Sequence, residues 1–128
     1  MAFIVAKTKE EGFAQLKELV STFEKGIKTF RDSKYNETQL RNDFVDSLLM
    51  SFGWDVDNEA GKNQFLRDVI QEESIEVEDE KSKKNPDYTL RVQGLRKLFV
   101  EAKKPHVDIA KSAKAAFQTR RYGWNANL

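Results

Sequence analysis

The chain has 128 residues, of which 39% are hydrophobic and 34% are charged, a size and composition that suit one domain with a single modest core. With no cysteine and one histidine, disulfides and thiolate-bound metals are excluded and histidine-dependent triads are disfavoured, so a metal site would need oxygen ligands. There is no apolar run long enough to span a membrane and no signal-peptide cleavage pattern, so we expect a cytoplasmic protein that does not associate with membranes.

The net charge is only +1, but the two signs are segregated along the chain. Seven acidic and no basic residues lie between Asp68 and Glu80, whereas eight basic and two acidic residues lie between Arg96 and Leu128. A basic excess on one folded surface attracts phosphate groups, while the simpler interpretation is a solvated helix face.

Two helices are predicted in the N-terminal half. Residues 10–31 carry apolar side chains at spacings of three and four, the pattern of an amphipathic helix: Phe13, Leu16, Val20, Phe23, Ile27 and Phe30. A second helix begins near Glu37, because Asn36 and Gln39 have the spacing of a capping box, and it ends at Gly53. Its expected apolar face consists of Leu40, Phe44, Leu48 and Leu49.

Strands are predicted next, followed by a last helix. Residues 54–56 suggest a short strand, 69–79 a strand or meander, and 87–92 with 97–103 an antiparallel hairpin about Gly94. After Pro105, residues 109–122 are rich in helix formers. This order predicts an α/β (α+β) fold in one domain over residues 1–128, with a mixed central sheet flanked by helices.

The hairpin pattern brings two acidic residues together. A turn at Gly94 would place Asp87 directly across from Glu101, with Cβ atoms about 5 Å apart. Two carboxylates at that separation repel each other unless a cation neutralises them, and oxygen ligands favour Mg²⁺ or Mn²⁺. Lys103 lies one pleat beyond Glu101 on the same face and could orient or deprotonate a metal-bound water. The simpler interpretation is a turn cap at Asp87 and an exposed Glu101–Lys103 pair on a solvated face.

Two helical positions extend this pattern. Glu37 precedes Leu40 and Phe44 by three and seven residues, so it should follow the core-facing stripe in the first turn of its helix, although its charge also suits a helix N-terminus. Gln118 and Tyr122 are four residues apart on one face of the last predicted helix. An ordinary polar helix face is the alternative there.

Together these residues resemble the PD-(D/E)xK nuclease superfamily, with Pro86-Asp87 followed by Glu101-Ala102-Lys103. Within it, the chain is most similar to the N-terminal nuclease domains of type I restriction R subunits and of type IIG restriction-modification enzymes. The resemblance rests on "NETQLR", "PDY", "FVEAKKP" and a Q-x-x-x-Y helix in this order, over about residues 35–124. It implies a restriction-endonuclease-like core and a Mg²⁺-dependent DNA endonuclease for which Mn²⁺ can substitute.

The resemblance also implies roles for individual residues. Asp87, Glu101 and the backbone carbonyl of Ala102 would bind metal, and Lys103 would be the catalytic lysine. Glu37 would support the metal or its waters, and Gln118 would orient the site. Contacts with the DNA backbone would come from Lys104, Lys111, Lys114, Arg120, Arg121 and Tyr122.

The family fold usually continues into another strand after the Q-x-x-x-Y helix, whereas this chain stops at "GWNANL". We therefore expect an N-terminal piece of a longer polypeptide. The stretch "KYNETQLRNDFVDSLLMSFGWDV" favours the type IIG arrangement, with methyltransferase and target-recognition domains, over a type I enzyme with a motor domain. The expected substrate is double-stranded DNA, and dimerisation for double-strand cleavage stays open. The alternatives are a catalytically inactive nucleic-acid-binding module of the same fold and a protein-interaction domain, which would show no salt-dependent DNA association.

Overall fold

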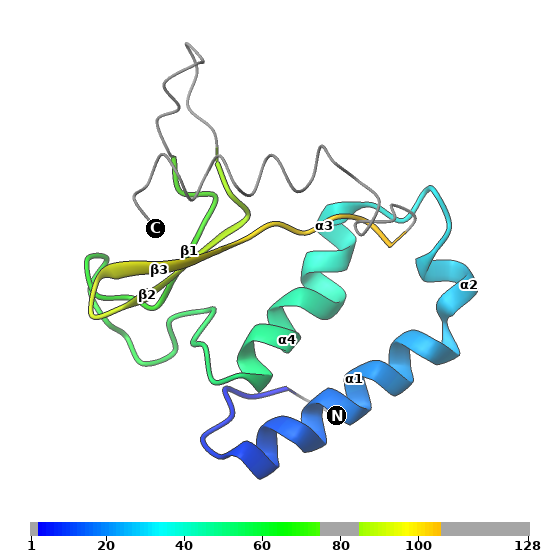
Figure 1. Cartoon of the computed structure of the whole chain (residues 1–128), viewed down its shortest axis with the longest axis horizontal. Helices are drawn as coiled ribbons and strands as arrows, with labels where there is room; N and C mark the ends of the chain where they lie inside the picture. The colour runs from blue at the N-terminus through cyan, green and yellow to red at the C-terminus, as the bar shows by residue number, and fades with distance from the viewer. Residues whose placement is uncertain (1–2, 75–84, 106–128) are drawn as a thin grey trace. The chain divides into compact units, whose positions relative to one another are not determined.

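The computed structural model describes residues 3–74 and 85–105. These residues fall into two compact units, one formed by 3–56 with 102–105 and the other by 57–74 with 85–101. Helices occupy the first unit and a sheet occupies the second (Figure 1). Over the described ranges, no helix combines the length and the apolarity needed to cross a membrane.

The first predicted helix is divided in two. Helix α1 (Lys9–Lys25) starts at Thr8, whose hydroxyl accepts a 3.1 Å hydrogen bond from the Glu11 N–H, and it ends at Gly26. A short helix α2 (Ile27–Phe30) follows directly. The helix expected over residues 10–31 is therefore present but interrupted near its C-terminal end, because Gly26 is a weak helix former at which α1 ends.

The buried face of α1 also differs from the predicted stripe. Gly12, Gln15 and Leu19 are its buried residues, whereas Phe13 and Val20 are exposed. At Gly12 the helix approaches the backbone so closely that a Cβ would lie 2.3 Å from the Ser51 carbonyl oxygen. The side-chain amide of Gln15 exchanges two hydrogen bonds with the backbone of Ile4, at 2.8 and 3.0 Å. A glycine and a glutamine thus occupy positions that an apolar pattern cannot reveal.

The second predicted helix is present with an irregular centre, as α3 (Glu37–Leu40), the π-helical turn η1 (Arg41–Val45) and α4 (Asp46–Ser51). The capping box is confirmed, since Gln39 N–H donates to the Asn36 side chain and Asn36 N–H donates to the Gln39 side chain. The wide turn shifts the apolar face by about one residue. Leu49 is buried at 6% exposure, as expected, whereas Leu48, also expected in the core, is 36% exposed.

Aromatic rings hold the helical unit together. Leu19, Tyr35 and Phe44 form its buried cluster, and Phe23 and Phe30 pack against them. The rings of Phe23 and Phe30 each meet Phe44 edge to face, with centroids 5.4 and 4.7 Å apart. Such pairs add roughly 0.5–1.5 kcal/mol each beyond the burial of their area.

The other unit contains a three-stranded sheet in the order β1-β2-β3, with β1 (Val69–Gln71), β2 (Tyr88–Val92) and β3 (Leu95–Val100). Both pairings are antiparallel, so the parallel pairing that a mixed sheet requires does not occur among the described strands. Helices with this sheet confirm an α+β fold. The strand expected at residues 54–56 is wrong: Asp55 and Val56 are buried, but no strand forms there. The helix expected at 109–122 lies outside the described residues.

The predicted hairpin is confirmed, with a more complex turn than a single glycine would give. Gln93 and Gly94 both have positive φ, 52° and 82°, which is the conformation of a two-residue turn matched to strand twist. Next to the turn, Arg91 pairs with Arg96, but beyond Lys97 the register shifts so that Leu90 pairs with Leu98 and Tyr88 with Val100. The bulge at Lys97 thus restores the register in which Asp87 is opposite Glu101.

Candidate active site

Asp87 lies just before β2 and Glu101 just after β3, so the hairpin brings the two residues together. The backbone N–H of Asp87 donates a 3.2 Å hydrogen bond to Oε1 of Glu101. Both residues are half-buried, and both belong to the sheet unit. The predicted adjacency of these two acids is therefore present in the structure, and the two are linked directly.

The sheet face that carries this pair is not a solvated face near the acids. Thr89, which shares the face with Asp87, is fully buried, and its partner Phe99 is half-buried. On the opposite face, which carries Tyr88, Leu90 and Leu98, Tyr88 and Leu90 are buried while Leu98 is 53% exposed. Because Thr89 is buried and both acids are half-buried, Asp87 and Glu101 do not form an exposed pair on a solvated face. Solvent therefore screens their charges less than it would at the surface.

The remaining predicted site residues are placed individually. Glu37 is half-buried in the first turn of α3, as its spacing predicted. Ala102 is buried, Lys103 and Lys104 are half-buried, and all three belong to the helical unit. Six predicted residues lie outside the described ranges: Lys111, Lys114, Gln118, Arg120, Arg121 and Tyr122.

Asp87 and Glu101 are suitable in number and chemistry for a magnesium ion. Among the described residues there is no group of three or more histidine, cysteine, aspartate or glutamate side chains that could hold a metal. Mg²⁺ commonly takes one or two protein carboxylates and completes its shell with waters and substrate phosphate, so it does not require such a group. An adjacent aspartate and glutamate therefore fit, in number and chemistry, a Mg²⁺ ion whose remaining ligands are waters and a substrate phosphate.

An ion pair that the sequence did not predict belongs to the same sheet unit. Strand β1 ends at Gln71, and Glu72 takes a positive φ of 54°, which turns the chain before Glu73. Nη2 of Arg96 then lies 2.9 Å from Oε1 of Glu73. Burial raises the pKa of the Glu73 carboxyl, but the hydrogen bonds from Arg96 and the positive charges of Arg96 and Arg91 outweigh it and hold this pKa below its usual range.

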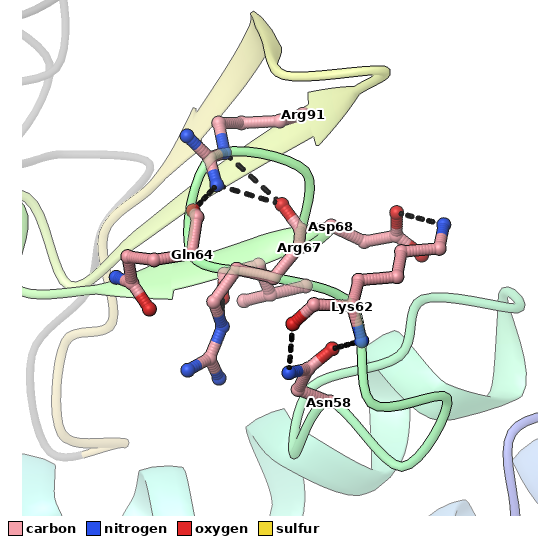
Figure 2. A network of polar contacts seen from close by, with 7 residues as sticks. Asn58, Lys62, Gln64, Arg67, Asp68 and Arg91 are labelled. Atoms are coloured by element: carbon pink, nitrogen blue, oxygen red, sulfur yellow. Dashed lines mark hydrogen bonds and ion pairs between the residues drawn. The ribbon is translucent and has the colours of Figure 1, made fainter.

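Arg91 itself is fixed by backbone oxygens (Figure 2). Its Nη2 donates to the carbonyls of Gln64 and Arg67 at 2.7 and 2.9 Å, and its Nε donates to the Arg67 carbonyl at 3.1 Å. The loop that it holds is further closed by Asn58, whose side chain exchanges two hydrogen bonds with the backbone of Lys62. Because these acceptors are neutral carbonyls, they hold the Arg91 guanidinium in place without a compensating negative charge, so Arg91 is a fixed positive centre within the hairpin.

Only part of this charged cluster could have been found from the sequence. Arg96 belongs to the basic excess and Glu73 to the acidic run, but their separation of 23 residues gives no periodicity from which a contact could be read. The turn at Glu72 could not be predicted either, because its positive φ is a conformation usually taken by glycine and the sequence has a glutamate there.

The chain belongs to the family of type I restriction enzyme R protein N termini (HSDR_N), which matches residues 59–126. It is thus a restriction-enzyme module, and the predicted resemblance to the N-terminal domains of restriction enzymes is confirmed. The chain is also 46% identical over 114 residues to the type II restriction enzyme and methyltransferase RM.Eco57I of Escherichia coli. That alignment covers 89% of this chain and 11% of the relative's length. No solved structure matches the chain.

Proposed function

We propose that this chain is the Mg²⁺-dependent DNA endonuclease module of a restriction-modification enzyme of the type IIG kind, built on the PD-(D/E)xK pattern. The observation that carries this proposal is the contact between Asp87 and Glu101, which are 14 residues apart in sequence and are joined by a 3.2 Å hydrogen bond. Family membership supports it, because the matched region of the restriction-enzyme family includes both acids. The 46% identical relative is named as a restriction enzyme and methyltransferase.

In the proposed site, Asp87, Glu101 and the Ala102 carbonyl hold Mg²⁺, and Mn²⁺ can replace it. When bound, the ion supplies Lewis-acid polarisation of the scissile phosphate and lowers the pKa of a bound water. Glu101 is held by the Asp87 N–H, which fixes the position of one of its carboxylate oxygens. Such orientation of a ligand by a backbone donor typically strengthens metal binding.

The other proposed residues act on the substrate. Lys103 orients the attacking water, and as an ammonium it stabilises negative charge that develops on the phosphate. Glu37 would support the metal site from the first turn of its helix, and Gln118 would orient the site. The phosphates of the DNA backbone are contacted by the cationic and phenolic side chains predicted above, namely Lys104, Lys111, Lys114, Arg120, Arg121 and Tyr122. Phosphate contacts position a protein on DNA but carry no sequence information.

The choice of DNA sequence is therefore assigned to other parts of a longer polypeptide. The chain spans about a ninth of the relative that it matches, and that relative's name includes a methyltransferase. We propose that methyltransferase and target-recognition domains act with this module on double-stranded DNA in the cytoplasm. Because one such site cuts one strand, two copies of the module would act together in double-strand cleavage.

The test is mutagenesis in the full-length enzyme. Asp87→Ala, Glu101→Ala and Lys103→Ala should each reduce cleavage of plasmid DNA by about a hundredfold or more, because each removes a metal ligand or a charge beside the reacting phosphate. Circular dichroism should show a folded protein in each case. Lys97→Ala, at the exposed bulge of the same hairpin, is the matched control and should keep cleavage near that of the unsubstituted enzyme.

Full cleavage by any of the three variants would contradict the proposal. If the unsubstituted enzyme binds DNA in a salt-dependent manner but cuts nothing with Mg²⁺ or Mn²⁺, the module is a DNA-binding domain without catalysis. Titration calorimetry with Mn²⁺ in the presence of DNA separates the two cases further, since metal binding that disappears in Asp87→Asn supports a catalytic site.

A further inference from the structure

The sheet face with the Asp87–Glu101 pair also carries cationic side chains nearer the hairpin turn. Asp87, Thr89 and Arg91 alternate along β2 and therefore share one face. Arg91 pairs directly with Arg96, and side chains of directly opposed residues lie on the same face of a sheet. Asp87 and Arg91 are four residues apart along the chain, a distance of about 13 Å along the face. The acids and the two arginines thus form one row within the sheet unit.

Glu73 covers one of these arginines. Nε of Arg96 lies 3.3 and 3.2 Å from Oε1 and Oε2 of Glu73, and Nη2 lies 2.9 Å from Oε1. Two nitrogens of the guanidinium therefore face both oxygens of one carboxylate. The pair is reachable from solvent, because 38% of the Arg96 side chain and 20% of the Glu73 side chain remain exposed.

A guanidinium uses the same fork of N–H donors for a carboxylate and for a phosphate. Glu73 therefore occupies the donors with which Arg96 would bind a DNA phosphate. The distance from the acids is suitable as well, since about 13 Å corresponds to roughly four nucleotides at 3.4 Å of helix axis per nucleotide of one strand. The fixed charge of Arg91 beside Arg96 adds to the attraction for an anion at this position.

We propose that Arg96 is a DNA phosphate-binding residue and that the Glu73 carboxylate occupies the phosphate position when DNA is absent. When DNA binds, the Arg96 guanidinium exchanges the carboxylate for a phosphate. This proposal rests on the proposed function, from which it takes DNA as the ligand. It assigns to the Glu73–Arg96 pair a competing role: the carboxylate lowers affinity for DNA and keeps the arginine side chain ordered. Neither residue is expected to bind the metal.

The experiment measures binding of a duplex to the full-length enzyme by fluorescence anisotropy with EDTA present, over a range of salt concentrations. Arg96→Gln should weaken binding and reduce the slope of log K against log salt by about 0.9, the loss of one phosphate contact. That change corresponds to about a threefold smaller loss of affinity between about 50 and about 200 mM salt. Glu73→Gln should tighten binding by about threefold or more, since a neutral amide competes less well for the guanidinium.

Asp68→Asn is the matched control for the change in net charge. Asp68 also lies in the sheet unit and forms an exposed ion pair, but its partner is Lys62, whose Nζ lies 3.0 Å from Oδ1, and not Arg96. It should change affinity much less than Glu73→Gln. In the double variant Glu73→Gln/Arg96→Gln, the gain from the first substitution should disappear, because the arginine that it releases is absent.

Two results would overturn this inference. One is an unchanged salt slope in Arg96→Gln, and the other is equal tightening by Glu73→Gln and Asp68→Asn, which would reflect net charge alone. Both are distinct from failure of the proposed function, because cleavage by the unsubstituted enzyme and its loss in Asp87→Ala are measured on the same DNA. An enzyme that cuts normally and shows either result keeps its proposed function without the Glu73–Arg96 exchange.

Discussion

The hydrogen bond of Tyr35 makes the stability of the helical unit depend on pH. Its hydroxyl donates a 2.6 Å bond to Oδ2 of Asp43, eight residues along the chain. The tyrosine is buried in the aromatic cluster. Burial, followed by the hydrogen bond to Asp43 and its negative charge, raises the pKa of the Tyr35 hydroxyl well above its usual range.

The sign of the resulting pH dependence follows from proton binding. Above a pH of about 10 the unfolded chain releases the tyrosine proton while the folded chain keeps it, so the free energy of unfolding falls as pH rises. Tyr35→Phe should lose about 1 kcal/mol of stability at neutral pH through the missing hydrogen bond. This difference from the unsubstituted chain should narrow above a pH of about 10. Urea unfolding of both chains at several pH values measures it, and a difference that stays constant would contradict the assignment.

At the scale of the element, the hairpin turn depends on a glycine for two separate reasons. Gly94 has a φ of 82°, and a Cβ placed on it would lie 2.7 Å from the carbonyl oxygen of Phe65. The positive φ requires a residue that tolerates a left-handed backbone. The close carbonyl leaves no room for a side chain at Gly94 against the loop that Arg91 holds. Gly61 has a φ of 68° and no atom within 4 Å of its Cβ position.

These two glycines form a matched pair for substitution. Gly61→Ala should destabilise the chain by roughly 1 kcal/mol, the cost of a left-handed conformation for a residue with a side chain. Gly94→Ala should cost more, about 2–4 kcal/mol, because the turn or the loop must also move away from the added Cβ. Chemical denaturation of the two variants measures the difference. Equal losses would show that the Phe65 carbonyl can withdraw without penalty.

The elements also show why some parts of the fold were predictable. Two features depend only on residues within a few positions of each other and can therefore be predicted from the sequence. They are the capping box of Asn36 and Gln39 and the positive φ at Gly94. The π turn at Arg41–Val45 and the bulge at Lys97 have no such local signature. Each adds one residue to a regular pattern and changes which side chains face inward, as Leu48 and Leu49 show.

At the scale of the molecule, metal binding should increase the thermal stability of the chain. A ligand that binds only the folded chain raises the free energy of unfolding, by about 1.4 kcal/mol at ten times its dissociation constant. We expect MgCl₂ or MnCl₂ at constant ionic strength to raise the Tm of the unsubstituted chain. Asp87→Asn and Glu101→Gln should remove that increase, and Asp68→Asn should keep it. An equal increase in all four chains would indicate nonspecific charge screening and would contradict a metal site at Asp87 and Glu101.

The sequence by itself determined the α+β class, the hairpin, the meeting of Asp87 with Glu101 and the membership in a restriction-enzyme family. Those features follow from strand alternation, a glycine turn and motifs of a few residues, which are local in the chain. Only the tertiary structure decided that Gly12 and Gln15 face the interior of the helical unit, and that Glu73 lies against Arg96. Such contacts join residues far apart in sequence through close backbone approach and charge, and neither leaves a periodic trace in the order of amino acids.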